Sequence, residues 1–504
     1  MSKFIATMGA IASIAGAPAL AQNSLPEAEF LPPPPVTPAA SPAPATETTV
    51  PVEVVPMTPT NQANPTAAEP DAAAEMPITD EYVTRLYSDA QRLISQQEYE
   101  SALIFLEEVL IIYPDYAPAY VSRGYVYNTL GDTGQALASF TEAINLKPDY
   151  GEAYLNRGAL YLQFRNYVVA ESDLQLAAQY LPNNAQAAFL LGVVYESQGN
   201  INRAEAQFNQ AIALQSDYAE PYVHRGAIRA ERGEYEAALA DFSSAIRSQS
   251  KYGAAFLNRG SVHFVLNNTE AALLDFNDAV RNDPTAIAYF SRGYVASLLN
   301  DLEPAFEDLT RAIELNPEYY LAYVNRGLVR GRAGDYERAI QDLDRAIGLE
   351  PSNAIAYKAK GDVYRMSGDV INAVVEYDRA LALQPDLEEA LQARADVRLT
   401  QGDAFGAAQD LTQVLFNNPS DADALSTRGA LRTTIGDSYG AIQDYNRAVE
   451  LNPFDADAFF NRGVARQAVG DRAGARQDLM RAAELYRQQG NGRGYRNAIS
   501  QMAR

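Results

Sequence analysis

The sequence contains no cysteine among its 504 residues. Without a thiol it can form no disulfide, no thiolate zinc site, no cysteine nucleophile and no lipidated N-terminal cysteine. Only two histidines occur, His224 and His263, and they lie far apart, without the i, i+4 spacing of a helical zinc pair. We therefore expect structural or surface roles for both histidines, no metal site and no cofactor.

Positive charge is also scarce, since 40 Lys and Arg face 64 Asp and Glu for a formal net charge of −24. A nucleic-acid binder needs Lys and Arg on a surface that neutralises phosphates. An anionic membrane surface makes the same demand. The composition therefore argues against both kinds of partner.

Catalytic motifs are missing as well. There is no local Ser/His/Asp motif, no phosphate-binding loop and no pair of carboxylates that stands out from the acidic surface. The glycine-rich stretch "GNGRGY" at 490–495 follows no strand, so we interpret it as a break before a short capping helix, Tyr495–Arg504. The sequence thus predicts that the protein is not an enzyme.

The first 21 residues have the pattern of a secretory signal peptide. Lys3 precedes an apolar stretch, Phe4–Ala17, and Ala19-Leu20-Ala21 forms a small-residue cleavage site. The alternative is an uncleaved anchor, but a short segment rich in Ala and Gly would insert weakly. We expect export to the periplasm, with secretion or a lumenal location as alternatives, and no membrane insertion once the signal is removed.

Residues 22–81 form a linker rich in Pro and Ala. This segment holds 14 of the 27 prolines, nine acidic residues and no Lys or Arg. It cannot bury enough apolar surface to offset chain entropy, so we predict a disordered spacer. Its stretch "FLPPPPVTP" could also serve as a polyproline ligand.

A repeat of 34 residues organises the chain from residue 82 to residue 489. One glycine marks it, at Gly124, Gly158, Gly192, Gly226, Gly260, Gly293, Gly327, Gly361, Gly429 and Gly463. Counting this glycine as position 8 gives twelve repeats, which start at residues 83, 117, 151, 185, 219, 253, 286, 320, 354, 388, 422 and 456. One residue is lost near Pro284, and the sequence leaves open whether this marks a hinge.

Each repeat has the start and stop signals of two helices. Position 15 is usually Gly, position 16 is usually an Asp or Asn that can cap a second helix, and position 32 is usually Pro. Small residues at positions 20 and 27, such as Ala136 and Ala143, flank a larger one at position 24, Phe140. Such spacing lets two helices pack closely, and it predicts an all-α protein.

With Gly at position 8, Ala at 20 and 27 and Pro at 32, the chain resembles the tetratricopeptide repeat family. The resemblance implies a right-handed superhelical solenoid of twelve helix-turn-helix repeats, closed by a capping segment at residues 490–504. It also implies that the first helices line a concave groove that binds proteins or peptides.

The resemblance implies that positions 5 and 9 of the first helices face this groove, with position 6 near its edge. These positions hold Val121, Tyr125, Leu155, Asn156, Phe189, Val193, Val223, Leu257, Asn258, Phe290, Tyr294, Val324, Asn325 and Leu328. An apolar lining is seldom left bare without a partner. The alternative is that these residues pack against the neighbouring repeat.

Position 7 is mostly Arg, and an acid follows it sixteen residues later at position 23. The pairs include Arg157 with Asp173, Arg225 with Asp241, Arg259 with Asp275, Arg292 with Asp308, Arg326 with Asp342, Arg428 with Asp444 and Arg462 with Asp478. Where Leu191 replaces the base, Gln207 replaces the acid. We predict structural ion pairs that join the two helices of a repeat. The further Arg residues at position 11 we interpret as solvated surface.

These features together predict a non-enzymatic exported scaffold that binds protein or peptide partners through the concave face. The alternative is a structural component of an envelope machine that exports polysaccharide or protein. The sequence leaves the identity of the partner and the oligomeric state open.

Overall fold

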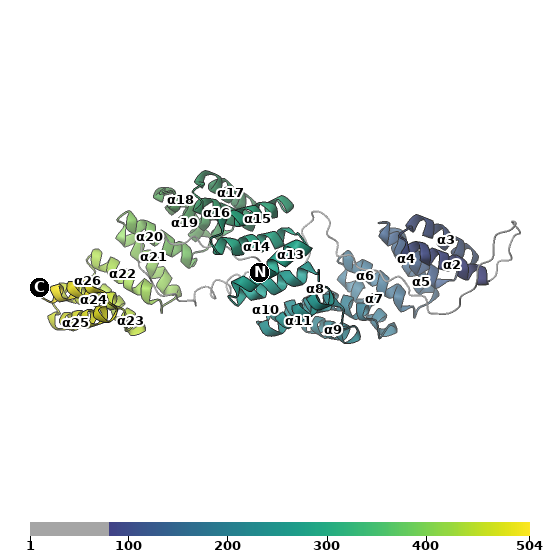
Figure 1. Ribbon diagram of the computed structural model, residues 1–504, viewed down its shortest axis with the longest axis horizontal. Helices are drawn as coiled ribbons and strands as arrows, with labels where there is room; N and C mark the ends of the chain where they lie inside the picture. Colours follow the sequence, from purple (N-terminus) through teal and green to yellow (C-terminus); the bar gives the residue numbers. More distant parts are fainter. Residues whose placement is uncertain (1–79, 504) are drawn as a thin grey trace. The chain divides into compact units, whose positions relative to one another are not determined.

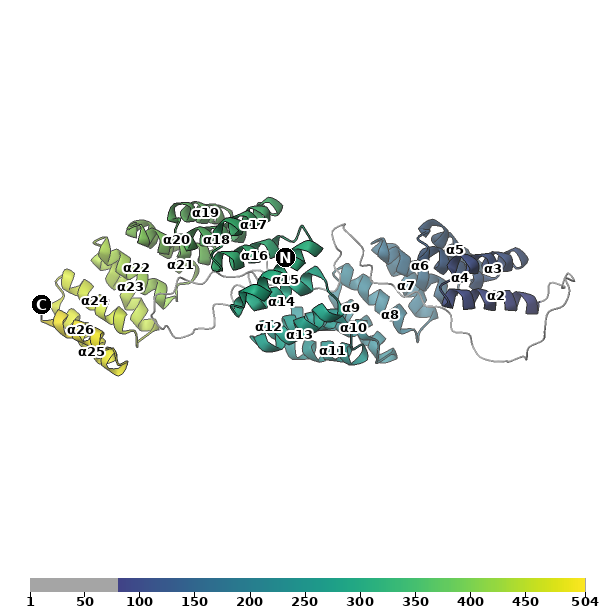
Figure 2. The same ribbon diagram turned by 45° about the horizontal axis from the view of Figure 1, so that its top comes forward.

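The computed structural model describes residues 80–503. The expected signal peptide and almost all of the expected linker lie outside these residues. Within them the chain forms helices α2 to α26 and no strand, which confirms the all-α class. The helices follow one another as hairpins in chain order (Figures 1 and 2).

The described residues divide between Pro284 and Thr285, where the repeat loses one residue, into two compact units. The N-terminal unit contains α2 Asp80–Ser95, α3 Tyr99–Ile112, α4 Ala117–Thr129, α5 Thr133–Leu146, α6 Gly151–Gln163, α7 Tyr167–Tyr180, α8 Ala185–Ser197, α9 Ile201–Leu214, α10 Ala219–Glu231, α11 Tyr235–Ser248, α12 Gly253–Val265 and α13 Thr269–Asn282.

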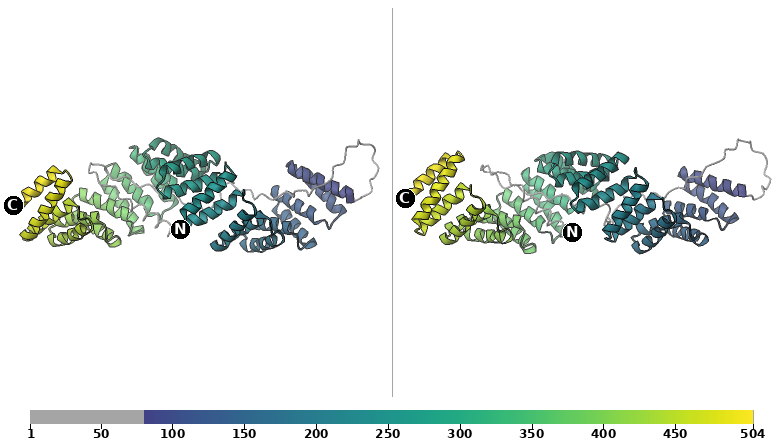
Figure 3. Two further views of the ribbon diagram at one scale, coloured as in Figure 1. Left: turned by 60° about the horizontal axis from the view of Figure 1, so that its bottom comes forward. Right: turned by 90° about the horizontal axis from the view of Figure 1, so that it is seen from below.

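The C-terminal unit contains α14 Ala286–Leu298, α15 Leu302–Leu315, α16 Tyr320–Arg332, α17 Tyr336–Leu349, α18 Ala354–Met366, α19 Val370–Leu383, α20 Glu388–Thr400, α21 Ala404–Asn417, α22 Ala422–Thr434, α23 Ser438–Leu451, α24 Ala456–Ala468, α25 Arg472–Gln488 and α26 Gly492–Met502. The helices at the C-terminal end, yellow in Figure 3, stack in chain order, and α26 packs on α25.

Helix boundaries follow the sequence repeat closely. From α4 on, the first helix of each hairpin begins at the first residue of a predicted repeat. The turn between the two helices is left-handed where glycine occurs at position 15, as at Gly131 with φ +82°. Asp132, Asp335 and Asp403 cap the helix that follows. The same role was expected of Asn200, Asn268 and Asp301, but their side chains make no capping bond.

Inside each hairpin, the position-8 glycine lies against the large residue at position 24. A Cβ atom added to Gly361 would lie 2.6 Å from Cε1 of Tyr377, and one added to Gly124 would lie 2.5 Å from the ring of Phe140. The alanines at positions 20 and 27, such as Ala373 and Ala380, are fully buried. In these hairpins the close approach of the two helices depends on the missing side chain at position 8.

The seven position-7 arginines and their aspartates are in contact in the structure. In each pair Nε and Nη2 of the arginine donate to the two carboxylate oxygens at 2.6 to 3.0 Å. The aspartates are buried. Hydrogen bonding to Asp173 raises the pKa of Arg157. Arg394 and Asp410 add an eighth pair of the same form. Each pair joins the two helices of one hairpin.

The same arginine also reaches the preceding repeat, which the sequence analysis did not anticipate. Its Nη1 donates to a polar side chain at position 25 of that repeat: Arg157 to Thr141, Arg225 to Asn209, Arg259 to Ser243, Arg326 to Thr310, Arg394 to Asp378, Arg428 to Thr412 and Arg462 to Asn446. One guanidinium therefore holds three helices together.

The arginines at position 11 are not simply solvated, contrary to our interpretation. Arg229, Arg330, Arg398, Arg432 and Arg466 each place Nη1 2.7 to 2.9 Å from the Oδ2 atom of their own position-23 aspartate. Two arginines one helical turn apart repel each other, but here both bind one buried carboxylate. That carboxylate supplies the charge that screens them.

We predict a strong coupling between Arg157 and Asp173, which has no second arginine because position 11 of this repeat is Tyr161. In a double-mutant cycle with Arg157→Ala and Asp173→Ala, each single change leaves a buried charge unpaired. The coupling energy should therefore reach about 1–3 kcal/mol, measured by chemical denaturation.

The exposed pair Arg281 and Asp278 provides the control, because its side chains are 73% and 36% exposed. Its coupling energy should stay below about 1 kcal/mol. Additive effects of the Arg157 and Asp173 substitutions would contradict a bracing role.

Two helical glycines should respond oppositely to alanine. Gly361→Ala should destabilise the protein by about 1–3 kcal/mol, because its Cβ would overlap Tyr377. Gly348, in α17, has no atom within 4 Å of an added Cβ, so Gly348→Ala should stabilise by about 0.5–1 kcal/mol. Thermal unfolding of both variants measures the difference, and a loss of stability in both would show that position 8 has no special packing role.

Candidate functional site

The residues expected to line a groove at position 5 lie mostly inside the protein. Val121, Leu155, Val223, Leu257, Phe290 and Val324 are buried, and Val121, Leu155 and Val223 belong to apolar clusters that span neighbouring hairpins. At position 9, Tyr294 and Leu328 are also buried. For these residues the structure favours the second alternative, packing against the neighbouring repeat.

The position-6 asparagines are buried too. Nδ2 of Asn156, Asn258 and Asn325 donates to the backbone carbonyl four residues earlier in its own helix, at 2.9 Å in each case. Such back-bonding is a common fate of Asn in a helix. One N–H of each of these three amides is therefore engaged within its own first helix.

Three of the expected residues stay partly accessible: Tyr125, Phe189 and Val193. Phe189 lies at the centre of a ring cluster between α8 and α10. Its centroid is 5.2 Å from that of Tyr218 and 5.3 Å from that of His224, both in edge-on contact, and 6.0 Å from that of Phe208. The Phe189 ring thus presents part of its surface beside polar groups.

One carboxylate contacts this ring cluster, and a second lies near the first. Nδ1 of His224 lies 2.7 Å from Oε2 of Glu196. Partial burial and the charge of Glu196 raise the pKa of Glu231, at the end of α10. Glu196 and Glu231 are therefore close enough to repel each other, and Glu196 contacts His224 of the ring cluster. We call Phe189, Glu196, His224 and Glu231 the Phe189 cluster.

The cations of the adjacent first helices are already engaged. Among the residues of α6, α8 and α10 the only Lys or Arg are Arg157, Arg225 and Arg229, and all three bind the position-23 aspartates. In α6, Oε2 of Glu152 is buried and accepts no hydrogen bond within the described residues. The first helices α6, α8 and α10 therefore carry carboxylates, while each of their arginines already binds an aspartate.

The sequence analysis missed the Phe189 cluster as a unit. His224 was expected to have a structural or surface role, and Glu196 was not singled out. The two residues occur at different repeat positions, so the 34-residue period does not relate them. The sequence did offer one sign of the cluster: an acidic residue, Glu196, occurs in a repeat whose first helix has no Lys or Arg.

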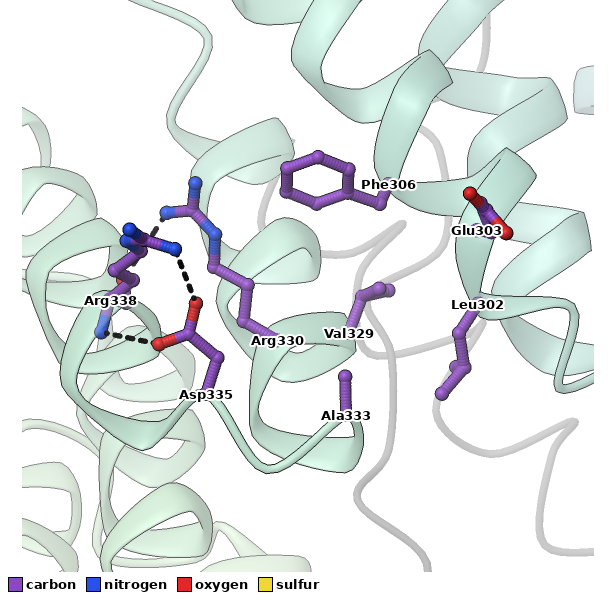
Figure 4. Close-up of a pocket in the computed structure, with 8 residues that line it drawn as sticks. All are labelled: Leu302, Glu303, Phe306, Val329, Arg330, Ala333, Asp335 and Arg338. Atoms are coloured by element: carbon purple, nitrogen blue, oxygen red, sulfur yellow. Dashed lines mark hydrogen bonds and ion pairs between the residues drawn. The ribbon is translucent and has the colours of Figure 1, made fainter.

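A depression in the C-terminal unit lies between α15, α16 and α17 (Figure 4) and encloses about 290 Å³. Leu302, Phe306, Val329 and Ala333 supply its apolar lining, with Glu303, Arg330, Asp335 and Arg338 around them. Arg330 stacks 5.3 Å from the Phe306 centroid and binds Asp342, while Asp335 and Arg338 pair with each other. Most charges here are satisfied internally, which makes this the weaker candidate.

Over residues 80–503, no group of three or more His, Cys, Asp and Glu side chains is arranged to hold a metal ion. In the same part of the chain, none of the helices combines the length and the apolar character needed to cross a membrane.

Solved structures with similar folds include YrrB, described as a tetratricopeptide repeat protein with an unusual peptide-binding site. It is 26% identical, with a TM-score of 0.33, and the match covers 37% of this chain and 97% of that one. Yeast Tom70 is 17% identical, with a TM-score of 0.39 and coverage of 84% and 96%. A tetratricopeptide repeat protein from Parabacteroides merdae is 20% identical, with a TM-score of 0.41 and coverage of 49% and 98%. A search of curated proteins returned no match.

Family models give a direct assignment of the repeats. Models described as "Tetratricopeptide repeat" match residues 173–219, 225–287, 286–319 and 324–388, and one described as "TPR repeat" matches residues 124–163 and 435–470. These segments lie within the run of hairpins described above, and residues 286–319 correspond to the hairpin α14–α15. The chain is therefore one that carries tetratricopeptide repeats.

Proposed function

We propose that this protein is a non-enzymatic, exported scaffold that binds a protein partner on the first-helix face of its N-terminal unit. Tetratricopeptide repeats are typical of protein–protein interaction scaffolds. The signal-like sequence at residues 1–21 supports export, with the periplasm as the location. The Phe189 cluster is the observation that carries the choice of binding surface.

The chemistry of the cluster favours a basic segment of the partner. Glu196 is half-buried, so a charge interaction there is stronger than in bulk solvent, and Glu231 lies exposed at the end of α10. A Lys or Arg placed between them relieves their mutual repulsion and favours the ionised form of Glu231. The Phe189 ring offers the same cation a π face or offers an apolar neighbour a contact.

The preference for a basic segment can be tested with a displayed library of random short peptides. The wild-type protein should enrich sequences with Lys or Arg beside an aromatic or aliphatic residue. Selected peptides should bind the Glu196→Gln/Glu231→Gln variant at least about tenfold more weakly by fluorescence anisotropy, because the variant loses charge-assisted hydrogen bonds.

The control is Glu318→Gln/Glu337→Gln, which removes two exposed carboxylates from the C-terminal unit. This variant should bind the selected peptides as the wild type does. An equal loss of peptide affinity in both variants would show that only the overall net charge matters. Enrichment of acidic or purely apolar peptides from the library would contradict the proposed partner chemistry.

A further inference from the structure

The C-terminal end of the chain has a charge opposite to that of the whole. Residues 472–504 contain seven arginines, Arg472, Arg476, Arg481, Arg487, Arg493, Arg496 and Arg504, and two acids, Asp478 and Glu484. The complete chain carries a formal charge of −24. The whole-chain charge that argues against anionic partners therefore does not describe this end.

Five of these arginines are exposed and make no ion pair within residues 80–503. They are Arg472, Arg476, Arg487, Arg493 and Arg496, on α25 and α26. Arg481 alone pairs with a carboxylate, Glu484. In the repeats before them, by contrast, most arginines are bound to aspartate. We call the five exposed arginines the C-terminal basic surface.

Apolar side chains accompany the basic surface. Tyr495 and Ile499 on α26 are 39% and 44% exposed, and Met480 on α25 is 56% exposed. Met480 occupies position 25, where earlier repeats place the polar acceptor for the next arginine, such as Thr412 or Asn446. The last repeat thus lacks the polar acceptor at position 25 that binds the arginine of a following repeat. Its helices combine unpaired arginines with exposed apolar side chains.

The sequence contains a matching segment. Residues 22–79 hold seven acids, Glu27, Glu29, Glu47, Glu53, Glu69, Asp71 and Glu75, without a single Lys or Arg. Arginine forks bind carboxylates in two-point contacts that ammonium groups cannot reproduce. The prolines of this segment restrict the free chain and so lower the entropy that it loses on binding.

We propose that the C-terminal basic surface binds the acidic, proline-rich segment 22–79 of a second copy of this chain. The segment precedes the first helix of one unit, and the surface ends the other unit. Copies joined through them make a head-to-tail contact. At physiological salt the Debye length is about 8 Å, so the remaining negative charge of each copy is screened while the direct contacts persist.

A charge-swap experiment tests the contact. Sedimentation velocity of the purified protein over a range of concentrations measures self-association. Arg493→Glu/Arg496→Glu changes the basic surface, and Glu69→Lys/Asp71→Lys changes the segment. Arg85→Glu/Arg345→Glu is the matched control, because it reverses two exposed arginines outside the surface, neither with an ion pair within the described residues.

The wild type and the control should associate with similar dissociation constants. Each swapped variant alone should lose at least about tenfold in affinity, and an equal mixture of the two should regain it, because every lost pair is restored with reversed sign. A wild type that stays monomeric, or a swapped variant that associates as before, would overturn the proposal. Binding of the wild type to phosphatidylglycerol vesicles without self-association would assign the surface to a lipid and would likewise overturn it.

Discussion

The structure depends on one buried ion pair that recurs at a fixed place in the repeat. The position-7 arginine grips the position-23 aspartate in two parallel hydrogen bonds and reaches position 25 of the preceding repeat with its third nitrogen. A buried carboxylate without a cation is costly, so an acid occurs at position 23 only where a base occurs at position 7. Arg123 is a base without that acid, and it donates to Ser139 instead. Lys360 and Glu376 keep both charges of the pair, whereas Leu191 and Gln207 carry neither.

The candidate site lies in a repeat that lacks both members of this ion pair. The fourth repeat has Leu191 instead of arginine, and Leu191 packs in an apolar cluster with Leu190 and Phe208. Its first helix therefore has no cation to offset Glu196, which turns to His224 of the next repeat. A repeat released from internal charge pairing can present its carboxylates and Phe189 to a partner. The arginine–aspartate pairs of the neighbouring repeats hold the hairpins around this face in position.

The helix boundaries and the ion pairs could be predicted because both repeat with a period of 34, so each residue type is seen many times at one position. The exposure of the groove residues could not, because the burial of Phe290 or Val324 depends on how closely the neighbouring first helix approaches. The link from position 7 to position 25 was within reach of the sequence, since Thr141, Ser243 and Thr412 are all polar. To find this link, position 7 of one repeat must be compared with position 25 of the repeat before it, not with positions of its own repeat.

The central claim is that one arginine couples two adjacent repeats, and hydrogen exchange of an Arg428→Met variant tests it most directly. In this variant Asp444 keeps Arg432 as its partner, so the hairpin α22–α23 retains one ion pair. We predict lower amide protection in α22 and α23 and also in α21, which holds Thr412, with more distant helices unchanged. Loss confined to α22 and α23, with α21 as protected as in the wild type, would contradict the account.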